Sequence, residues 1–137
     1  MRILVVEDHA DIRTAVCAIL KSHKNVRICY EAANGEEAVK KALELNPDLA
    51  VLDIFMPVLD GFGAARRIRE HLPQLPILMI TTNPDPDLRE ISVSVGAQGF
   101  LHKSDIADSL LQATETLLAR GTSCPISLAK RSRRKLF

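Results

Sequence analysis

The chain has 137 residues, of which 47% are hydrophobic, and this is enough for one domain that folds without disulfide staples. The opening apolar run ends at Glu7 and Asp8, too soon for a signal peptide or a membrane span, so we expect a cytoplasmic protein without membrane contact. The formal net charge of +1 is unevenly spread, because residues 130–137 carry five bases and no acid and residues 1–129 come to −4. We therefore expect a mildly acidic body and a basic tail.

The three cysteines, Cys17, Cys29 and Cys124, are widely separated and show no metal-ligand spacing. An odd number of scattered thiols in apolar or strand-like surroundings is typical of buried or incidental residues in a reducing compartment. The sequence therefore predicts neither a disulfide framework nor a zinc site.

Short apolar runs alternate along the chain with segments of helical spacing. The strand-like runs cover residues 3–6, 26–30, 49–54, 77–80 and 99–101. Apolar residues three or four positions apart occupy residues 12–19, 38–45, 62–68, 88–95 and 106–117. This alternation predicts an α/β fold with a parallel sheet and helices on both faces. The second run alternates polar and apolar residues and so predicts an edge strand, whereas the first, third and fourth are apolar enough for buried strands.

Polar side chains follow the strands at their C-terminal ends, where open parallel sheets bind ligands. They are Glu7 and Asp8 after the first run, Asp53 after the third, Thr81 after the fourth, and Lys103 two residues beyond the fifth. Three adjacent carboxylates repel one another and need a cation, and oxygen ligands select a hard ion such as Mg²⁺. One carboxylate can then attack phosphorus while the ammonium and the hydroxyl stabilise the transferred oxygens. The sequence predicts a phosphoryl-transfer site.

The residues at these positions resemble the receiver domain of bacterial response regulators. The resemblance spans residues 2–120 and is carried by Glu7-Asp8, Asp53 followed by Met56-Pro57, Asp60-Gly61, Thr81, and Lys103 after Gly99-Phe100. It implies a flavodoxin-like (CheY-like) five-stranded parallel sheet in the order 2-1-3-4-5, with helices on both faces. It also implies a phosphoprotein that takes part in two-component signal transduction.

The resemblance assigns a role to each site residue. Asp53 would accept a phosphoryl group from a sensor histidine kinase, with Thr81 and Lys103 as the other catalytic residues. Magnesium would be held by Asp8, Asp53 and the backbone carbonyl of Phe55, and Glu7 would reach it mainly through water. Phe100 would occupy the aromatic switch position that responds to Thr81. The chain would act on no other molecule and would catalyse only its own phosphorylation and dephosphorylation.

Simpler interpretations remain open for several of these residues. Asp8 could cap the helix that follows it, and Phe100 could be an ordinary core residue. Thr82 competes with Thr81 for the hydroxyl role, but Thr81 lies at the family's distance from Lys103. His9, beside the acidic pair, is expected to be an exposed residue near the pocket mouth rather than a metal ligand.

The end of the resemblance points to a subfamily. Ser104 follows Lys103 where many receivers have proline, and Ser104-Asp105 resembles the NarL and LuxR subfamily, as does Arg120-Gly121 leading through Cys124-Pro125 to Leu128. In that subfamily a linker and a DNA-binding helix-turn-helix follow. We expect a receiver over residues 1–120 and a disordered basic linker or tail over residues 121–137, which could also be an artificial extension or a true end.

The resemblance locates output on the fourth helix, the fifth strand and the fifth helix, and predicts transcriptional control through a helix-turn-helix domain absent from this sequence. DNA contact would require that domain. A homodimer could form through the same surface or through the first and fifth helices. The alternative is a stand-alone phosphorelay or protein-binding receiver without DNA output.

Two other classes fit the architecture less well. A haloacid-dehalogenase phosphatase needs a second aspartate two residues after the first, and Phe55 holds that position. A flavodoxin-type module needs a hydroxyl- and glycine-rich phosphate loop after the first strand, where this chain has Glu7-Asp8-His9.

Overall fold

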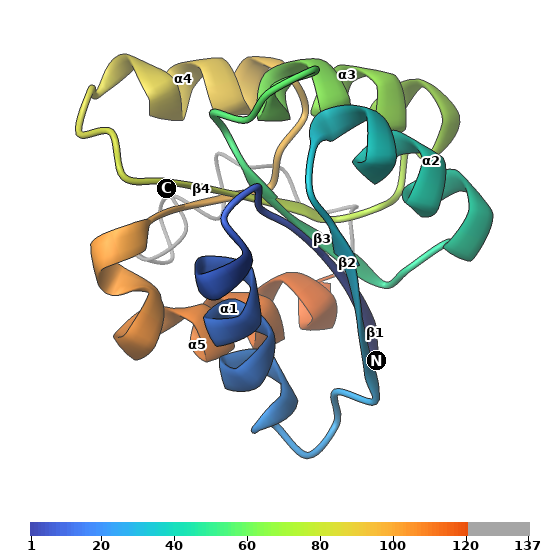
Figure 1. Ribbon diagram of the computed structural model, residues 1–137, viewed down its shortest axis with the longest axis vertical. Helices are drawn as coiled ribbons and strands as arrows, with labels where there is room; N and C mark the ends of the chain where they lie inside the picture. Colours follow the sequence, from blue (N-terminus) through green and yellow to red (C-terminus); the bar gives the residue numbers. More distant parts are fainter. Residues whose placement is uncertain (121–137) are drawn as a thin grey trace.

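Residues 1–120, the part of the chain that the computed structural model describes, alternate five strands with five α-helices (Figure 1). In chain order the elements are β1 (Arg2–Val6), α1 (Ala10–Lys21), β2 (Ile28–Ala32), α2 (Gly35–Leu45), β3 (Leu49–Asp53), α3 (Gly61–His71), β4 (Ile77–Thr81), α4 (Asp87–Ser94), β5 (Gly99–His102), the short 3-10 helix η1 (Lys103–Asp105) and α5 (Ile106–Arg120). None of the helices within residues 1–120 has the length and apolarity that crossing a lipid bilayer requires. The predicted tail, residues 121–137, lies outside the described residues.

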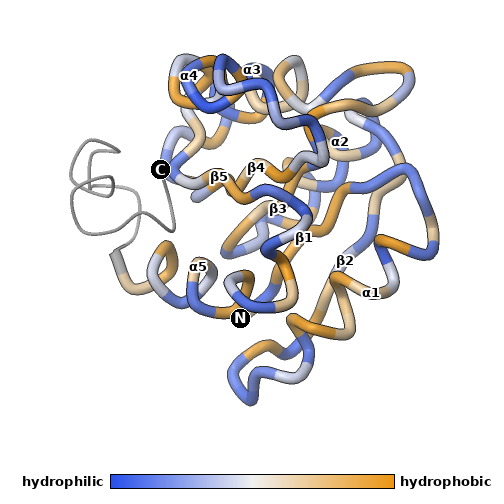
Figure 2. Tube along the Cα trace, turned by 90° about the vertical axis from the view of Figure 1, so that its left-hand side faces the viewer, coloured by the Kyte–Doolittle hydropathy of each residue, from blue (hydrophilic) through white to orange (hydrophobic). Residues whose placement is uncertain are grey.

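The five strands form one parallel sheet in the order β2-β1-β3-β4-β5, which confirms the predicted topology. Helices α1 and α5 cover one face and α2, α3 and α4 cover the other (Figure 1). All residues of β3 and β4 are buried, and Figure 2 shows hydrophobic stretches in the strands between the two helical layers. β2 lies at an edge, as its alternating pattern predicts.

The second strand starts later than predicted. The expected strand covered residues 26–30, whereas β2 runs from Ile28 to Ala32. Val26 is buried, but its N–H donates to the carbonyl of His23 at 3.0 Å and so closes a turn instead of joining the sheet. The apolar Val26 therefore makes the strand pattern in the sequence begin two residues before the strand itself.

Helix α4 buries two of its three predicted core residues. Leu88 and Val95 are buried as expected, but Ile91 is 36% exposed and Ser92 replaces it in the interior. The Ser92 hydroxyl donates to the Leu88 carbonyl at 2.8 Å, which satisfies this buried polar group within the helix. The helix has only eight residues and no side-chain cap at its N-terminus.

At the end of the connection from β3 to α3, the backbone of Gly61 comes very close to the backbone at the end of β3. The Gly61 N–H donates to the Ile54 carbonyl at 2.7 Å, and a Cβ atom at Gly61 would overlap the Asp53 carbonyl oxygen and the Ile54 Cα. The preceding residue, Asp60, caps α3 by accepting the Gly63 N–H at 2.8 Å. This glycine lets the helix begin directly beside the end of β3.

We expect Gly61→Ala to lower the free energy of unfolding by roughly 1–3 kcal/mol, because the added methyl group meets rigid backbone on two sides. Gly63→Ala is the matched control, since its methyl group would meet the end of the flexible Leu59 side chain and alanine favours the helix. Urea unfolding measures both variants. Equal stability of the two would contradict the proposed backbone overlap.

Candidate functional site

The register of the sheet brings the predicted site residues to one edge. Val6 lies opposite Leu52, Asp53 opposite Ile80, and Thr81 opposite His102. Side chains that follow these positions therefore meet beyond the C-terminal ends of four neighbouring strands. Chain connections leave β1 and β3 toward opposite faces of the sheet, and such reversal points form the ligand crevice of open α/β folds.

Lys103 joins two of the predicted carboxylates. Its Nζ lies 2.5 Å from Glu7 Oε1 and 3.2 Å from Asp53 Oδ2. The side chains of Glu7 and Asp53 are 0% and 6% exposed, and that of Lys103 is 11% exposed. One buried ammonium group thus faces two buried carboxylates, which leaves an uncompensated negative charge in the pocket.

The two carboxylates respond to this arrangement in opposite ways. Burial and the neighbouring Glu7 charge raise the pKa of Asp53 to about 6, although the Lys103 charge opposes them. Burial also disfavours the ionised form of Glu7, but the hydrogen bonds from Lys103 and the His9 N–H outweigh it and lower the Glu7 pKa to about 2. Burial lowers the pKa of Lys103, yet Glu7 and Asp53 together raise it above its ordinary value. Asp53 is therefore the carboxylate whose charge is less well compensated.

Asp8 is available to a cation. Within residues 1–120 its Oδ1 is buried without a hydrogen-bond partner, although the His9 Nδ1 lies 3.3 Å away. The capping interpretation of Asp8 is wrong, because the N-cap of α1 is His9 and no side chain caps that helix. An unpartnered carboxylate oxygen beside two further carboxylates fits the donor set of a hard divalent ion.

His9 is exposed over 70% of its side chain, as expected, yet its ring turns toward the acidic pair. Nδ1 lies 3.2 Å from Glu7 Oε2, and ligand atoms of Glu7, Asp8 and His9 lie within 4.8 Å of one another. Asp53 does not belong to that group, since its carboxylate faces Lys103. The carboxylates therefore form two groups, one in which Glu7 and Asp8 lie beside His9 and one in which Glu7 and Asp53 face Lys103.

The two threonines after β4 differ in burial. Thr81 is 1% exposed and its Oγ1 accepts the Asn83 N–H at 3.1 Å, whereas Thr82 is exposed. Thr81 is therefore the buried hydroxyl of the two, and its role in the site stays a prediction. Phe100 is 6% exposed on β5, and the Arg89 guanidinium of α4 lies 4.9 Å from the centre of its ring.

Phe55 and Asn83 follow Asp53 and Thr81 by two positions each. Phe55 is 50% exposed, so its ring does not belong to the core. The Asn83 side-chain oxygen accepts the Asp85 N–H at 2.9 Å, which holds this amide in the turn before α4. The side-chain oxygen of Asn83 is therefore already used by a hydrogen bond within its own loop.

Sequence reasoning does not single out Arg13, which supports the acidic pair. Its Nη1 donates to the Glu7 carbonyl at 2.7 Å, and its Nε donates to Glu31 Oε1 on β2 at 2.9 Å. The side chain joins α1, the edge strand and the backbone of the site. An arginine on a helix carries no sequence signal for such a role, because the contact depends on how α1 lies on the sheet.

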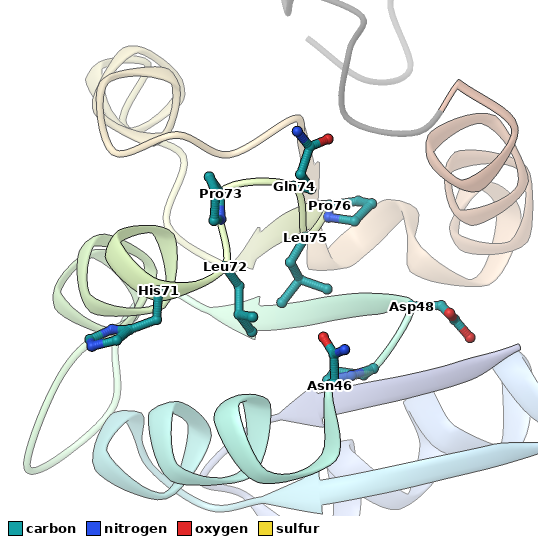
Figure 3. A pocket seen from close by; sticks show the side chains of 9 residues that line it. Asn46, Asp48, His71, Leu72, Pro73, Gln74, Leu75 and Pro76 are labelled. Carbon is teal, nitrogen blue, oxygen red and sulfur yellow. The ribbon is translucent and has the colours of Figure 1, made fainter.

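Two hollows lie near strand ends in the described part of the chain. One, of about 430 Å³, lies between α1 and α5 and includes Lys103 and Thr82 in its lining, with Ile12, Ile19 and Ile106. The other, of about 340 Å³, lies at the opposite end of the sheet, around Asn46, Asp48 and residues 71–76 (Figure 3). That end holds none of the predicted site residues, so we assign it no part in the chemistry.

The sequence matches known proteins over most of its length. Residues 3–115 match the family described as the response regulator receiver domain. Transcriptional regulatory protein LnrK of Bacillus subtilis is 33% identical over 128 residues, which are 93% of this chain and 58% of LnrK. Response regulator protein VraR of Staphylococcus aureus is 32% identical over 114 residues, which are 80% of this chain and 54% of VraR. The chain spans about half the length of these curated relatives.

The fold also matches solved structures. A crystal structure of a LuxR-family two-component response regulator from an Aurantimonas species superposes with a TM-score of 0.83 and 30% identity, covering 94% of this chain and 92% of that one. Sequence and fold therefore point to the same group of proteins, close to the NarL and LuxR subfamily.

In buffer without divalent cations, we expect Asp53→Asn to raise the free energy of unfolding at pH 7 by roughly 1–3 kcal/mol. A pKa raised by burial and by Glu7 from 3.8 to about 6 means that the folded state binds the proton more tightly than the unfolded state. The wild type then loses stability as the pH rises from about 4 to about 6, and the variant does not. Urea unfolding over a pH series measures the difference, which should vanish below that window.

Glu7→Gln is the control and should have the opposite sign at pH 7. The Glu7 pKa is lowered from 4.5 to about 2, because Lys103 and the His9 N–H outweigh burial, so its ionised form stabilises the fold. That contribution is complete above the unfolded pKa and is lost as the pH falls toward about 2. Stabilisation by both substitutions would contradict the charge distribution described above.

Proposed function

The chain belongs to the response regulator receiver family, and on this basis we propose that Asp53 accepts a phosphoryl group from the phosphohistidine of a sensor histidine kinase. Receivers of this family interact with such kinases and bind Mg²⁺ at an acidic pocket. The contact of Lys103 with both Glu7 and Asp53, beyond the C-terminal edge of the sheet, carries the assignment to these residues. The protein would be a switch that modifies itself, and not an enzyme with a separate substrate.

In this proposal the Asp53 carboxylate attacks phosphorus, and the bond from phosphorus to the kinase histidine breaks. A pKa raised by burial and by Glu7 to about 6 still leaves the carboxylate mostly ionised at neutral pH, as a nucleophile must be. Lys103, 3.2 Å from Asp53 Oδ2, would balance the charge on the transferred group, and the buried Thr81 hydroxyl would donate to one of its oxygens. Asp53, Lys103 and Thr81 would all act from positions at or next to the C-terminal ends of strands.

The donor set fits a magnesium ion. Asp8, Asp53 and the Phe55 carbonyl would hold it, and the unpartnered Oδ1 of Asp8 supports this choice. Both oxygens of Glu7 already accept hydrogen bonds from Lys103 and His9, so Glu7 would act through water. A bound Mg²⁺ would offset the carboxylate charge and coordinate phosphoryl oxygens.

Output would pass from Thr81 through Phe100 to the surface of α4, β5 and α5. Two features of α4 support this route. It is short, without a side-chain cap and rich in serine and β-branched residues, so a change of arrangement costs little. It also carries two partly exposed apolar residues, Ile91 and Val93, whose exposed fractions are 36% and 38%. Its Arg89 guanidinium lies over the ring of Phe100 on β5. This surface, or that of α1 and α5, would also serve a homodimer.

The effect of the switch would be transcriptional control through a helix-turn-helix domain, which the regulatory relatives and the LuxR-family structure favour. DNA contact belongs to that further domain, because residues 1–120 consist wholly of the receiver fold. The second candidate is a stand-alone phosphorelay receiver that acts by protein contact. A cognate partner that binds only the phosphorylated chain, without DNA, would favour the second candidate.

We expect Asp53→Asn to abolish phosphorylation by acetyl phosphate and Mg²⁺, because the isosteric amide cannot act as the nucleophile. Asp60→Asn is the matched control, since asparagine can keep the N-cap hydrogen bond of α3 and the site is left intact. Intact-mass spectrometry measures the gain of one phosphoryl group. Phosphorylation of the Asp53 variant at the wild-type level would refute the assignment.

We expect Asp8→Ala to remove Mg²⁺ binding, because it takes away a carboxylate whose buried Oδ1 lacks a hydrogen bond within residues 1–120. Amide chemical-shift titration with Mg²⁺ measures affinity without any phosphodonor. Asp11→Ala, an exposed acid in the first turn of α1, is the control and should bind as the wild type does. Retained affinity in the Asp8 variant would show that the ligand set is different.

We expect the phosphoryl group to persist for many minutes, because neither Phe55 nor Asn83 can position the attacking water. Phe55 has no hydrogen-bonding group, and the Asn83 amide is held by Asp85. Phe55→Glu should speed hydrolysis by about 10²-fold, the usual contribution of a water-positioning or basic group. Val58→Glu, an exposed apolar residue of the same loop, controls for added charge.

The decay of the acyl phosphate after rapid removal of the phosphodonor gives these rates. Loss of the wild-type phosphoryl group within seconds, or equal rates in the two glutamate variants, would rule out shielding by Phe55.

A further inference from the structure

Two thiols meet where helix α1 lies against the edge strand β2. Cys17 is buried on α1 and Cys29 is half-buried on β2. The Cys29 Sγ lies 4.0 Å from the Cys17 carbonyl oxygen, so the two residues are in contact across the interface of helix and strand. Twelve positions separate them in the sequence, which explains why their spacing does not predict a pair.

The pairing is set by the register of α1 on β2. One step along the same interface, Arg13 on α1 bonds Glu31 on β2 at 2.9 Å. Four residues of helix rise about 6 Å and two residues of strand rise only slightly more, so the Arg13–Glu31 contact and the Cys17–Cys29 contact are neighbouring contacts along one interface. The thiols are therefore held together by the packing of two regular elements rather than by a mobile loop.

The two sulfurs have different chemical character. The hydrogen bond from Cys17 and the nearby Lys21 ammonium lower the pKa of Cys29, against burial and the Glu31 charge. The same hydrogen bond, together with burial, raises the pKa of Cys17. A partly exposed thiol of lowered pKa beside a buried thiol is the arrangement of an oxidation-sensitive cysteine and its resolving partner.

We propose that Cys17 and Cys29 form a reversible intramolecular disulfide when the protein meets a hydroperoxide. The Cys29 sulfur attacks a peroxide oxygen, the O–O bond breaks, and the departing oxygen leaves as an alcohol or as water with the thiol proton. The Cys17 sulfur then attacks the resulting Cys29 sulfenic acid, the S–O bond breaks, and the Cys17 proton leaves with hydroxide as water. Both sulfurs are oxidised by one electron each, and the peroxide is reduced by two.

This disulfide would tie α1 to the edge of the sheet. Helix α1 begins directly after Glu7, Asp8 and His9, and Arg13 joins the same helix to the Glu7 carbonyl. Disulfides in reducing compartments are usually transient and redox-sensing, and a pair that forms only under peroxide fits that pattern. The modification does not depend on the proposed phosphorylation of Asp53.

The test uses the full chain with Cys124→Ser, so that Cys17 and Cys29 are its only thiols. Hydrogen peroxide should lower the intact mass by two hydrogen atoms, and dithiothreitol should restore it. Peptide mapping should find Cys17 joined to Cys29. In the same background, Cys17→Ala should stop at a Cys29 sulfenic acid that dimedone traps, whereas Cys29→Ala should leave Cys17 as a free thiol.

Three outcomes would overturn the proposal, and the first two need no variant at the paired positions. One is the accumulation of Cys29 sulfinic acid while Cys17 stays free in the folded protein. Another is a disulfide between two chains in place of the internal one. The third is equal reactivity of Cys17 whether or not Cys29 is present, with circular dichroism used to confirm that the variants are folded.

Discussion

One ammonium group, that of Lys103, faces the two buried carboxylates of Glu7 and Asp53, and the site depends on this unequal balance of charge. The shorter contact goes to Glu7, whose pKa falls, while burial and Glu7 raise the pKa of Asp53. Asp8 adds a third carboxylate with a buried oxygen that has no hydrogen bond within residues 1–120. Such a cluster disfavours the metal-free fold and favours the binding of a cation or a transferable group that redistributes its charge.

The sheet can hold this charged edge because its middle is almost wholly apolar. Buried residues of β1, β3 and β4 anchor the strand ends, and the close approach at Gly61 positions α3 beside Asp53. The regions expected to respond are built differently. Helix α4 is short and lacks a side-chain cap, and it exposes apolar residues. In the proposed switch, a well-packed sheet beside a short, uncapped helix would let a local change of charge alter a distant surface.

The pattern of apolar and polar residues predicts the five strands, the edge position of β2 and the set of polar residues at the strand ends. It can do so because the number of buried faces of a strand determines which of its residues are apolar. Other features need the packed molecule. The start of β2 is obscured by Val26, which is buried under a loop, and Ile91 is exposed because Ser92 satisfies its own hydroxyl within α4. The contact of Cys17 with Cys29 depends on the register of α1 on β2. The backbone of Val58 has a positive φ of 71°, which a β-branched residue rarely adopts and which its sequence therefore does not predict.

Chemical trapping on the unmodified sequence tests most directly whether Asp53, among the clustered acids, is the phosphoryl acceptor that we propose. The wild-type chain is treated with acetyl phosphate and Mg²⁺, reduced with borohydride and digested, so that an aspartyl phosphate is converted to homoserine at its own position. The account predicts homoserine at position 53 alone and none when Mg²⁺ is chelated. Homoserine at Asp8, at Asp60 or at no position would contradict it.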